Sequence, residues 1–247
     1  MKKIIYIISL FVSSVLYTSC DALDLAPEDY FGSGNYWNNK AQVEGFMNGM
    51  HSQLRSNYNM FYCLGELRGG TQRVGSSSQN TSLDYAILRT NTLSQDNPGF
   101  SNWFGLYSPI MQVNHFIQKV ENECDFLSEA DRKAYLGQAY GLRAFYYFYL
   151  YCTYGGVPLE TEAKVVDGNI DPSQLYKERA TPEQVLNQIK GDIKLSEENF
   201  NNTNKESFDK YEWTYYSTEL LKAKVYLWSA KVTTGDHKAS LIGTDPN

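Results

Sequence analysis

Apolar residues recur at steps of three and four along most of the chain, which is the spacing that lines one face of an α-helix. The first stripe predicts a helix from about Lys40 to Arg55 and consists of Val43, Phe46, Met47, Met50 and Leu54. A second stripe starts at Trp103 and continues to Val120. Pro109 lies inside it, so this helix should either kink there or start late.

Capping residues mark the next helices. Ser128 precedes Glu129-Ala130-Asp131 in a capping-box pattern, which predicts a helix that opens at Ser128 and stops at Gly155-Gly156. Apolar and aromatic residues surround this helix on most sides, so we expect it to be central. Thr181-Pro182-Glu183-Gln184 predicts another helix start, and a last helix is expected from about Thr218 to Lys231.

A long polar and glycine-rich stretch runs from about Leu64 to Phe100 between the first two helices. Loops of this length inside compact domains are usually functional or disordered, and the apolar residues within this one argue against disorder. We therefore predict an irregular loop that contacts a ligand. Short extended pieces are expected at Pro158 to Thr161 and at Lys164 to Val166.

These elements predict an all-α fold of stacked antiparallel helix pairs with one long irregular loop. Small residues alternate with aromatic ones on the helices, for example Ala144 with Tyr147 and Ala223 with Tyr226. That alternation is typical of tetratricopeptide-like packing, where a small residue lets a neighbouring aromatic approach, although no thirty-four-residue repeat is visible.

The first twenty residues predict export and lipidation. Met1-Lys2-Lys3 is a short cationic start, and the apolar run from Ile4 to Tyr17 is too short to span a bilayer readily. Tyr17-Thr18-Ser19-Cys20 resembles the lipobox of bacterial lipoproteins, which implies a signal peptide over residues 1–19 and lipidation of Cys20. Residues 20–35 would form the tether. The alternative is an ordinary secretory peptide cut near Ser19, with Cys20 an incidental thiol.

Composition narrows the function classes. The net charge is −6 and no basic cluster occurs, so we expect no nucleic-acid partner. Cys63, Cys124 and Cys152 are widely spaced and are interpreted as buried or free thiols, with a single disulfide as the alternative. Aromatic residues make 15 % of the chain and serve either helix interfaces or sugar stacking. Trp103 and Trp228 lie on helical stripes and are expected in the core.

Several segments together resemble the RagB/SusD family, whose members are outer-membrane lipoproteins that capture glycans in Bacteroidetes. The matching segments are Gly137 to Phe148, Tyr154 to Leu159, Tyr176 to Val185, Ala223 to Leu227, and Trp103 with Tyr107, Ile110 and Asn114. The resemblance implies a SusD-like N-terminal helical domain over residues 36–232, with residues 233–247 a polar tail. It also implies a longer protein, of which this chain would be the N-terminal portion.

The same resemblance implies a surface-exposed, lipid-anchored protein of the outer membrane, held there by lipid on Cys20. The acidic residues that follow Cys20 resemble the signal that sends such lipoproteins to the cell surface. The implied partners are an oligosaccharide or polysaccharide and a SusC-like TonB-dependent transporter. The alternative function is a tetratricopeptide-like scaffold of the envelope that binds no sugar.

Glycan binding needs aromatic faces and side chains that hydrogen-bond pairs of hydroxyls. The long loop supplies both, so composition and loop length make Arg68, Arg73 and Tyr85 the candidate glycan-binding residues. The alternative is that arginine and aspartate pairs order the loop.

No enzyme chemistry is predicted. The histidines are isolated, and no metal-binding, nucleophile or phosphate-loop motif occurs, so we expect no metal and no cofactor. A carboxylate pair for glycoside hydrolysis has no sequence spacing of its own, and we interpret the acidic residues as solvated surface. His115 is expected to be packed or capping.

Overall fold

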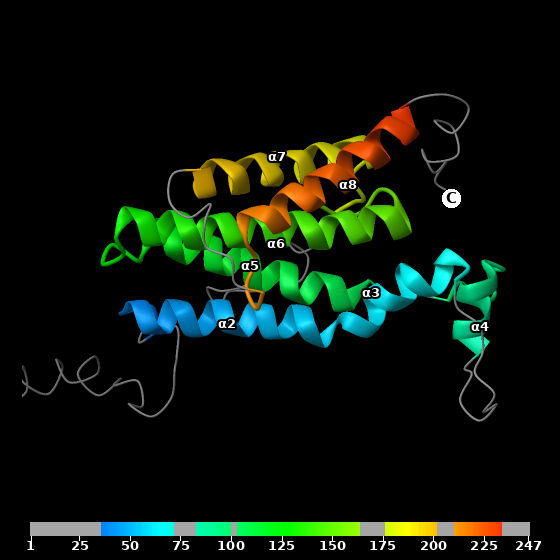
Figure 1. Cartoon of the computed structure of the whole chain (residues 1–247), viewed down its shortest axis with the longest axis horizontal. Helices are drawn as coiled ribbons and strands as arrows, with labels where there is room; N and C mark the ends of the chain where they lie inside the picture. Colours follow the sequence, from blue (N-terminus) through cyan, green and yellow to red (C-terminus); the bar gives the residue numbers. More distant parts are fainter. Residues whose placement is uncertain (1–35, 72–82, 100–102, 164–175, 202–209, 234–247) are drawn as a thin grey trace, which may run out of the picture. The chain divides into compact units, whose positions relative to one another are not determined.

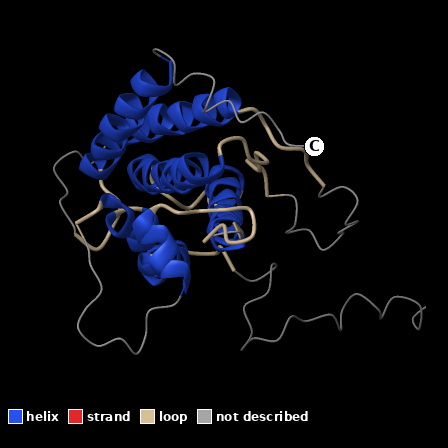
Figure 2. Ribbon diagram, turned by 90° about the vertical axis from the view of Figure 1, so that its right-hand side faces the viewer, coloured by secondary structure: helices blue, strands red, loops and turns tan. Residues whose placement is uncertain are grey.

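The computed structural model describes residues 36–71, 83–99, 103–163, 176–201 and 210–233. Every described helix lies in the unit Asn39–Asn247. The described elements are helices and loops without a strand (Figure 2), so the predicted all-α class is confirmed. They are α2 (Lys40–Ser56), α3 (Tyr58–Leu64), the 3₁₀ turn η2 (Glu66–Gly69), α4 (Leu83–Thr90), α5 (Phe104–Asn122), α6 (Glu129–Tyr154), α7 (Pro182–Asn201) and α8 (Tyr215–Thr233).

Helix α6 is the centre of the arrangement. It packs against α5, α7 and α8, while α2 packs against α5. Successive long helices run in opposite directions (Figure 1), which confirms the stacked antiparallel pairs. Residues on several faces of α6 are buried, including Leu142, Tyr146, Tyr147 and Leu150, as its nearly continuous apolar sequence predicts.

Glycines of α6 allow neighbouring aromatic rings to approach. A Cβ on Gly141 would lie 2.0 Å from the indole nitrogen of Trp213, and one on Gly137 would lie 3.0 Å from the Phe200 ring. The Trp213 indole donates a hydrogen bond to Thr218 Oγ1 at 2.8 Å. These two glycines therefore set the close packing expected of a tetratricopeptide-like fold.

The predicted caps are confirmed. Ser128 Oγ accepts from the Asp131 backbone N–H at 3.1 Å. Thr181 and Gln184 form the reciprocal capping box, with bonds of 2.8 and 3.2 Å. Gly155 ends α6 at a φ of 71°, a backbone conformation that favours glycine. Residues close in sequence therefore define where the central helices start and stop.

The structure refines two expectations about the first half of the chain. The stretch from Leu64 to Phe100 is not irregular throughout, because it contains η2 and α4. A small core of Cys63, Leu67 and Leu88 stabilises these short helices through contacts that are distant in sequence. Helix α5 begins at Phe104, five residues before Pro109, so of the two expected alternatives the structure excludes the late start.

The segment Pro158 to Thr161, expected to be extended, is neither helix nor strand. Lys164 to Val166 lie outside the described residues. Across the described ranges, no helix combines the length and apolarity needed to cross a membrane.

Candidate ligand-binding site

Arg68 is positioned by the short turn η2. Leu67 is buried beneath the turn, and Gly70 ends it at a φ of 78°. Arg68 Nε donates to Asn91 Oδ1 at 3.0 Å, and Asn91 Nδ2 donates back to the Arg68 carbonyl at 3.3 Å. Asn91 follows α4 with a φ of 52°, which asparagine tolerates better than most residues. This reciprocal pair fixes η2 to the end of α4.

A cleft of about 680 Å³ opens between η2, the C-terminal half of α6 and the C-terminal half of α8. We call it the α8 cleft. Phe148 and Tyr149 of α6 and Trp228 of α8 give it aromatic walls, and Arg68, Lys224 and Lys231 supply its charges. Phe148 and Trp228 meet edge to face, with ring centroids 6.4 Å apart. The α8 cleft therefore combines apolar faces with charged donors.

A second cleft, of about 610 Å³, lies on the other side of Arg68, and we call it the Trp103 cleft. The Arg179 guanidinium lies 5.4 Å from the centre of the Trp103 ring. Arg179 also donates from Nε to the Gly156 carbonyl and from Nη2 to the Tyr154 carbonyl, both at 2.7 Å. It thereby stabilises the end of α6 and holds the Trp103 ring in place.

The two clefts meet at Leu64, Arg68, Cys152 and Thr153, which line both. Burial raises the pKa of Cys152 to about 12, with Lys224 opposing the shift, so this thiol is neutral at physiological pH. Thr153 Oγ1 donates to the Tyr149 carbonyl at 2.8 Å. The residues that line both clefts therefore carry no negative charge, and Arg68 is the cation among them.

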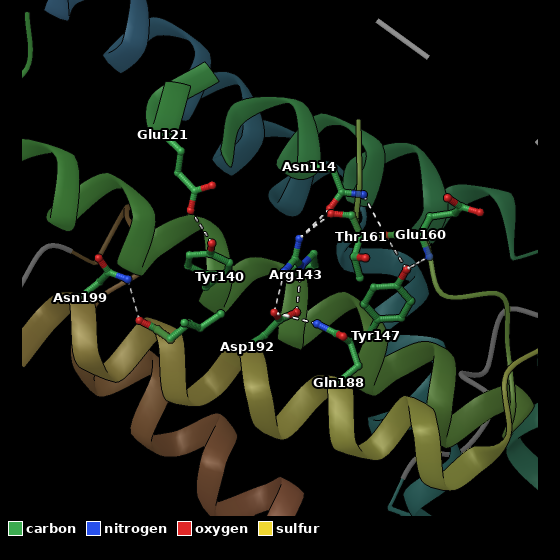
Figure 3. A network of polar contacts seen from close by, with 11 residues as sticks. Asn114, Glu121, Tyr140, Arg143, Tyr147, Glu160, Thr161, Gln188, Asp192 and Asn199 are labelled. Carbon is green, nitrogen blue, oxygen red and sulfur yellow. Dashed lines mark hydrogen bonds and ion pairs between the residues drawn. The ribbon is translucent and has the colours of Figure 1, made fainter. Parts of the chain in front are cut away.

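A buried polar network joins three of the helices (Figure 3). Arg143 of α6 donates from Nη2 to Asp192 Oδ1 at 2.7 Å and from Nε to Asp192 Oδ2 at 2.9 Å. Its Nη1 donates to Asn114 Oδ1 and to the Thr161 carbonyl. Burial disfavours the charged guanidinium, but the hydrogen bonds and charge of Asp192 outweigh it and raise the pKa of Arg143. The network joins α5, α6 and α7, and its polar groups form their hydrogen bonds with one another.

The segment after α6 is fixed by the same helices. Tyr147 Oη donates to the Glu160 carbonyl and accepts from the Glu160 backbone N–H, at 2.8 and 2.7 Å. Asn114 Nδ2 also donates to the Glu160 carbonyl, and Tyr107 Oη donates to the Pro158 carbonyl. Each backbone group of Glu160 therefore has a partner, as buried main chain requires.

The structure separates the predicted glycan-binding residues. Arg68 lies at the junction of both clefts. Tyr85 lies on α4, lines neither cleft and accepts a hydrogen bond from Asn59 Nδ2 at 3.0 Å. Arg73 lies outside the described residues, as does Cys20. Arg68 pairs with an asparagine, which differs from the expected arginine–aspartate pair.

Other residues of the clefts were not predicted. Trp103 and Trp228 were expected in the core, but both are only half-buried and each lines a cleft, so that prediction is wrong. The reason is visible on α8, where Leu220 and Leu227 are 70 % and 75 % exposed although Leu221 and Val225 are buried. Apolar residues surround α8, so periodicity does not identify its buried face. Lys224 and Lys231, spaced by seven, were the available signal.

The described residues offer no group of three potential ligands for a metal ion. Cys63, Cys124 and Cys152 are free thiols. His51 is structural, because its Nε2 accepts the Trp213 backbone N–H at 2.8 Å and its Nδ1 lies 3.0 Å from the Met47 carbonyl. His115 packs near Phe46, with ring centroids 5.8 Å apart.

Comparisons with known proteins agree with the fold. The SusD-like family model described as "Starch-binding associating with outer membrane" matches residues 23–227. SusD-like protein P38 of Formosa agariphila is 25 % identical over 230 residues, which cover 92 % of this chain and 42 % of that protein.

Two solved structures of proteins from Bacteroides fragilis are also similar to this chain. A SusD superfamily protein has a TM-score of 0.66 at 37 % identity, over 82 % of this chain and 40 % of its own. NanU has a TM-score of 0.70 at 34 % identity, over 86 % and 41 %. The chain thus spans about two fifths of the length of these relatives.

Proposed function

The chain belongs to the SusD-like family, and on that premise we propose that it binds a glycan or other nutrient at the outer membrane and delivers it to a SusC-like TonB-dependent transporter. The family's description as starch-binding and associated with the outer membrane supports the first part. Delivery to a transporter is part of the same proposal and follows from the sequence resemblance. The proposed protein acts by binding and has no catalytic step.

The observation that supports binding most strongly is the pair of clefts that meet at Arg68. Sugar rings present apolar C–H patches and pairs of hydroxyls. Half-buried Trp103 and Trp228 offer ring surface in the two clefts, and the Arg68 guanidinium offers donors in a planar fork between them. Ligand sites are typically concave and mostly apolar with a few placed polar groups, as here.

The test is affinity electrophoresis of the full chain in gels that contain different polysaccharides. We expect retardation by at least one polysaccharide, and Arg68→Ala should weaken it about tenfold, since hydrogen bonds to a charged group contribute roughly 1.5–3 kcal/mol. Arg73→Ala and Tyr85→Ala test the other two candidates singly. Arg89→Ala, on α4 and outside both clefts, is the matched control. Absence of retardation by every polysaccharide would contradict the proposal.

Membrane anchoring needs a separate test. We propose that lipid on Cys20 holds the protein at the cell surface. A single acyl chain binds a membrane only marginally, whereas two or three buried chains give durable attachment. Labelled palmitate should enter the wild-type chain and fail to enter Cys20→Ala. Equal labelling of both would remove Cys20 as the anchor. Co-purification of a TonB-dependent barrel with the tagged protein from detergent-solubilised membranes tests the transporter.

A further inference from the structure

The charges that line the clefts are of one sign. The whole chain has 28 acidic and 22 basic residues, yet the described lining of both clefts contains Arg68, Arg179, Lys224 and Lys231 and no aspartate or glutamate. An acidic protein that gathers cations around a cavity favours an anionic ligand there. Resting on the proposed function, we infer that the α8 cleft binds an acidic oligosaccharide through the carboxylate or sulfate groups of its sugars.

The cations of the α8 cleft are available to a ligand. Elsewhere in the described chain most lysines lie within ion-pair distance of a carboxylate; these are Lys40, Lys119, Lys133, Lys177, Lys194 and Lys222. Lys224 and Lys231 are exposed, and neither has an ion-pair partner among the described residues. Arg68 donates from Nε to Asn91 and lines both clefts.

Nearby negative charge is small. Glu66 lies on η2, outside the lining of both clefts. Burial is the main cause that raises the pKa of Tyr149, Cys152 comes second, and the negative charge of Glu66 contributes least. The Cys152 thiol is neutral. The described lining of the α8 cleft therefore carries three cations and no carboxylate.

The spacing of the cations favours an oligosaccharide over a single small anion. Lys224 and Lys231 lie two turns apart on α8, which is about 10 Å along the helix axis. That spacing lets the two ammonium groups engage separate anionic groups of one extended ligand. Between them lie Leu227 and Trp228, with Phe148 and Tyr149 on the opposite wall, so apolar ring faces alternate with positive charge. A chain of charged sugars presents C–H faces and anionic groups in the same alternation.

The experiment compares polysaccharides that differ only in charge. Affinity electrophoresis of the full chain uses polygalacturonate with its methyl ester, for carboxylate, and dextran sulfate with dextran, for sulfate. We expect at least one charged member to bind about tenfold more tightly than its neutral partner, with an affinity that falls as salt screens the charges. The pair that responds identifies the anionic group.

A double variant locates the effect. Lys224→Gln/Lys231→Gln should weaken binding of the charged polysaccharide about tenfold more than that of its neutral partner. Lys194→Gln, on the exposed surface of α7 and outside both clefts, is the matched control. Equal binding of charged and neutral members, or no effect of the double variant, would overturn the inference and leave glycan binding intact. No binding to any polysaccharide would overturn the proposed function as well.

Discussion

Charged side chains differ between two regions of the molecule. One region is the junction where α5, α6 and α7 meet, and the other is the α8 cleft. At the junction, Arg143 and Asp192 are 5 % and 0 % exposed and satisfy each other with two hydrogen bonds. In the cleft, Lys224 and Lys231 are exposed beside the half-buried Trp228 without a described ion-pair partner. Polar groups that are buried and fully paired stabilise one packing arrangement, whereas exposed and unpaired ones are available to a ligand.

The same difference applies to apolar side chains. Most large side chains of α6 are buried, but on α8 Leu220, Tyr226 and Leu227 are exposed. The junction therefore acts as a scaffold. In the cleft region, exposed side chains can still gain favourable contacts when a ligand binds. Substitutions should separate the two, because the first region should respond in stability and the second in binding.

The largest effect is expected at the buried ion pair. Arg143→Met leaves the Asp192 carboxylate buried without its partner and should cost about 3–5 kcal/mol of the free energy of unfolding, measured by urea denaturation. Arg143→Met/Asp192→Leu replaces both charges and should recover most of that loss. A single variant that loses less than about 1 kcal/mol would contradict the role of this pair.

Close packing on α6 gives the next effect. Gly141→Ala would place a Cβ against the Trp213 indole and should destabilise the fold by about 1–3 kcal/mol. Gly191→Ala on α7 is the matched control, since nothing lies within 4 Å of its added Cβ. That variant should gain up to about 1 kcal/mol from helix propensity. Thermal unfolding of both variants checks the opposite signs, and equal shifts would contradict the account.

A smaller effect concerns acid stability at the start of α6. Hydrogen bonds from Lys40 and Ser128 lower the pKa of Asp131. Its folded pKa is therefore below the ordinary value of about 3.9, so this stabilisation is present above that pH and is lost as the pH falls through the folded value. Asp131→Asn should flatten the decline of the unfolding midpoint in that acidic range. Unchanged pH profiles would exclude this contribution.

The smallest effect is expected in the cleft. Lys224→Gln and Lys231→Gln should each change the free energy of unfolding by less than about 0.5 kcal/mol, because exposed and unpaired charges contribute little to stability. Urea denaturation provides the measurement. A loss comparable to that of Gly141→Ala would mean that these lysines belong to the scaffold, and the contrast between the two regions would fail.

Local chemistry made part of the fold predictable. Ser128, Thr181 with Gln184, and Gly155 satisfy helix ends through neighbours a few residues away, so their patterns are visible in the sequence. Helix α4 was missed because its stability depends on Leu88 meeting Cys63 and Leu67 from a distant segment. The Arg143–Asp192 pair joins residues 49 positions apart and has no local signature.

The candidate site was less predictable than the fold. Arg68 was selected from the composition of its loop, and the structure places it between two clefts. Tyr85, selected on the same basis, lies outside them because α4 turns it toward Asn59. The seven-residue spacing of Lys224 and Lys231 places them on one face of α8, but the sequence does not show whether that face is exposed, since this depends on which elements cover the helix.

Hydrogen–deuterium exchange of the full chain, with and without the polysaccharide that gives the strongest retardation, tests the central claim most directly. Binding in the clefts predicts slower exchange in residues 64–69, 91–98 and 148–154 and in the C-terminal half of α8, with no change where α6 meets α7 at Arg143 and Asp192. Protection confined to other parts of the chain, with these segments unaffected, would contradict the assignment of the clefts as the binding site.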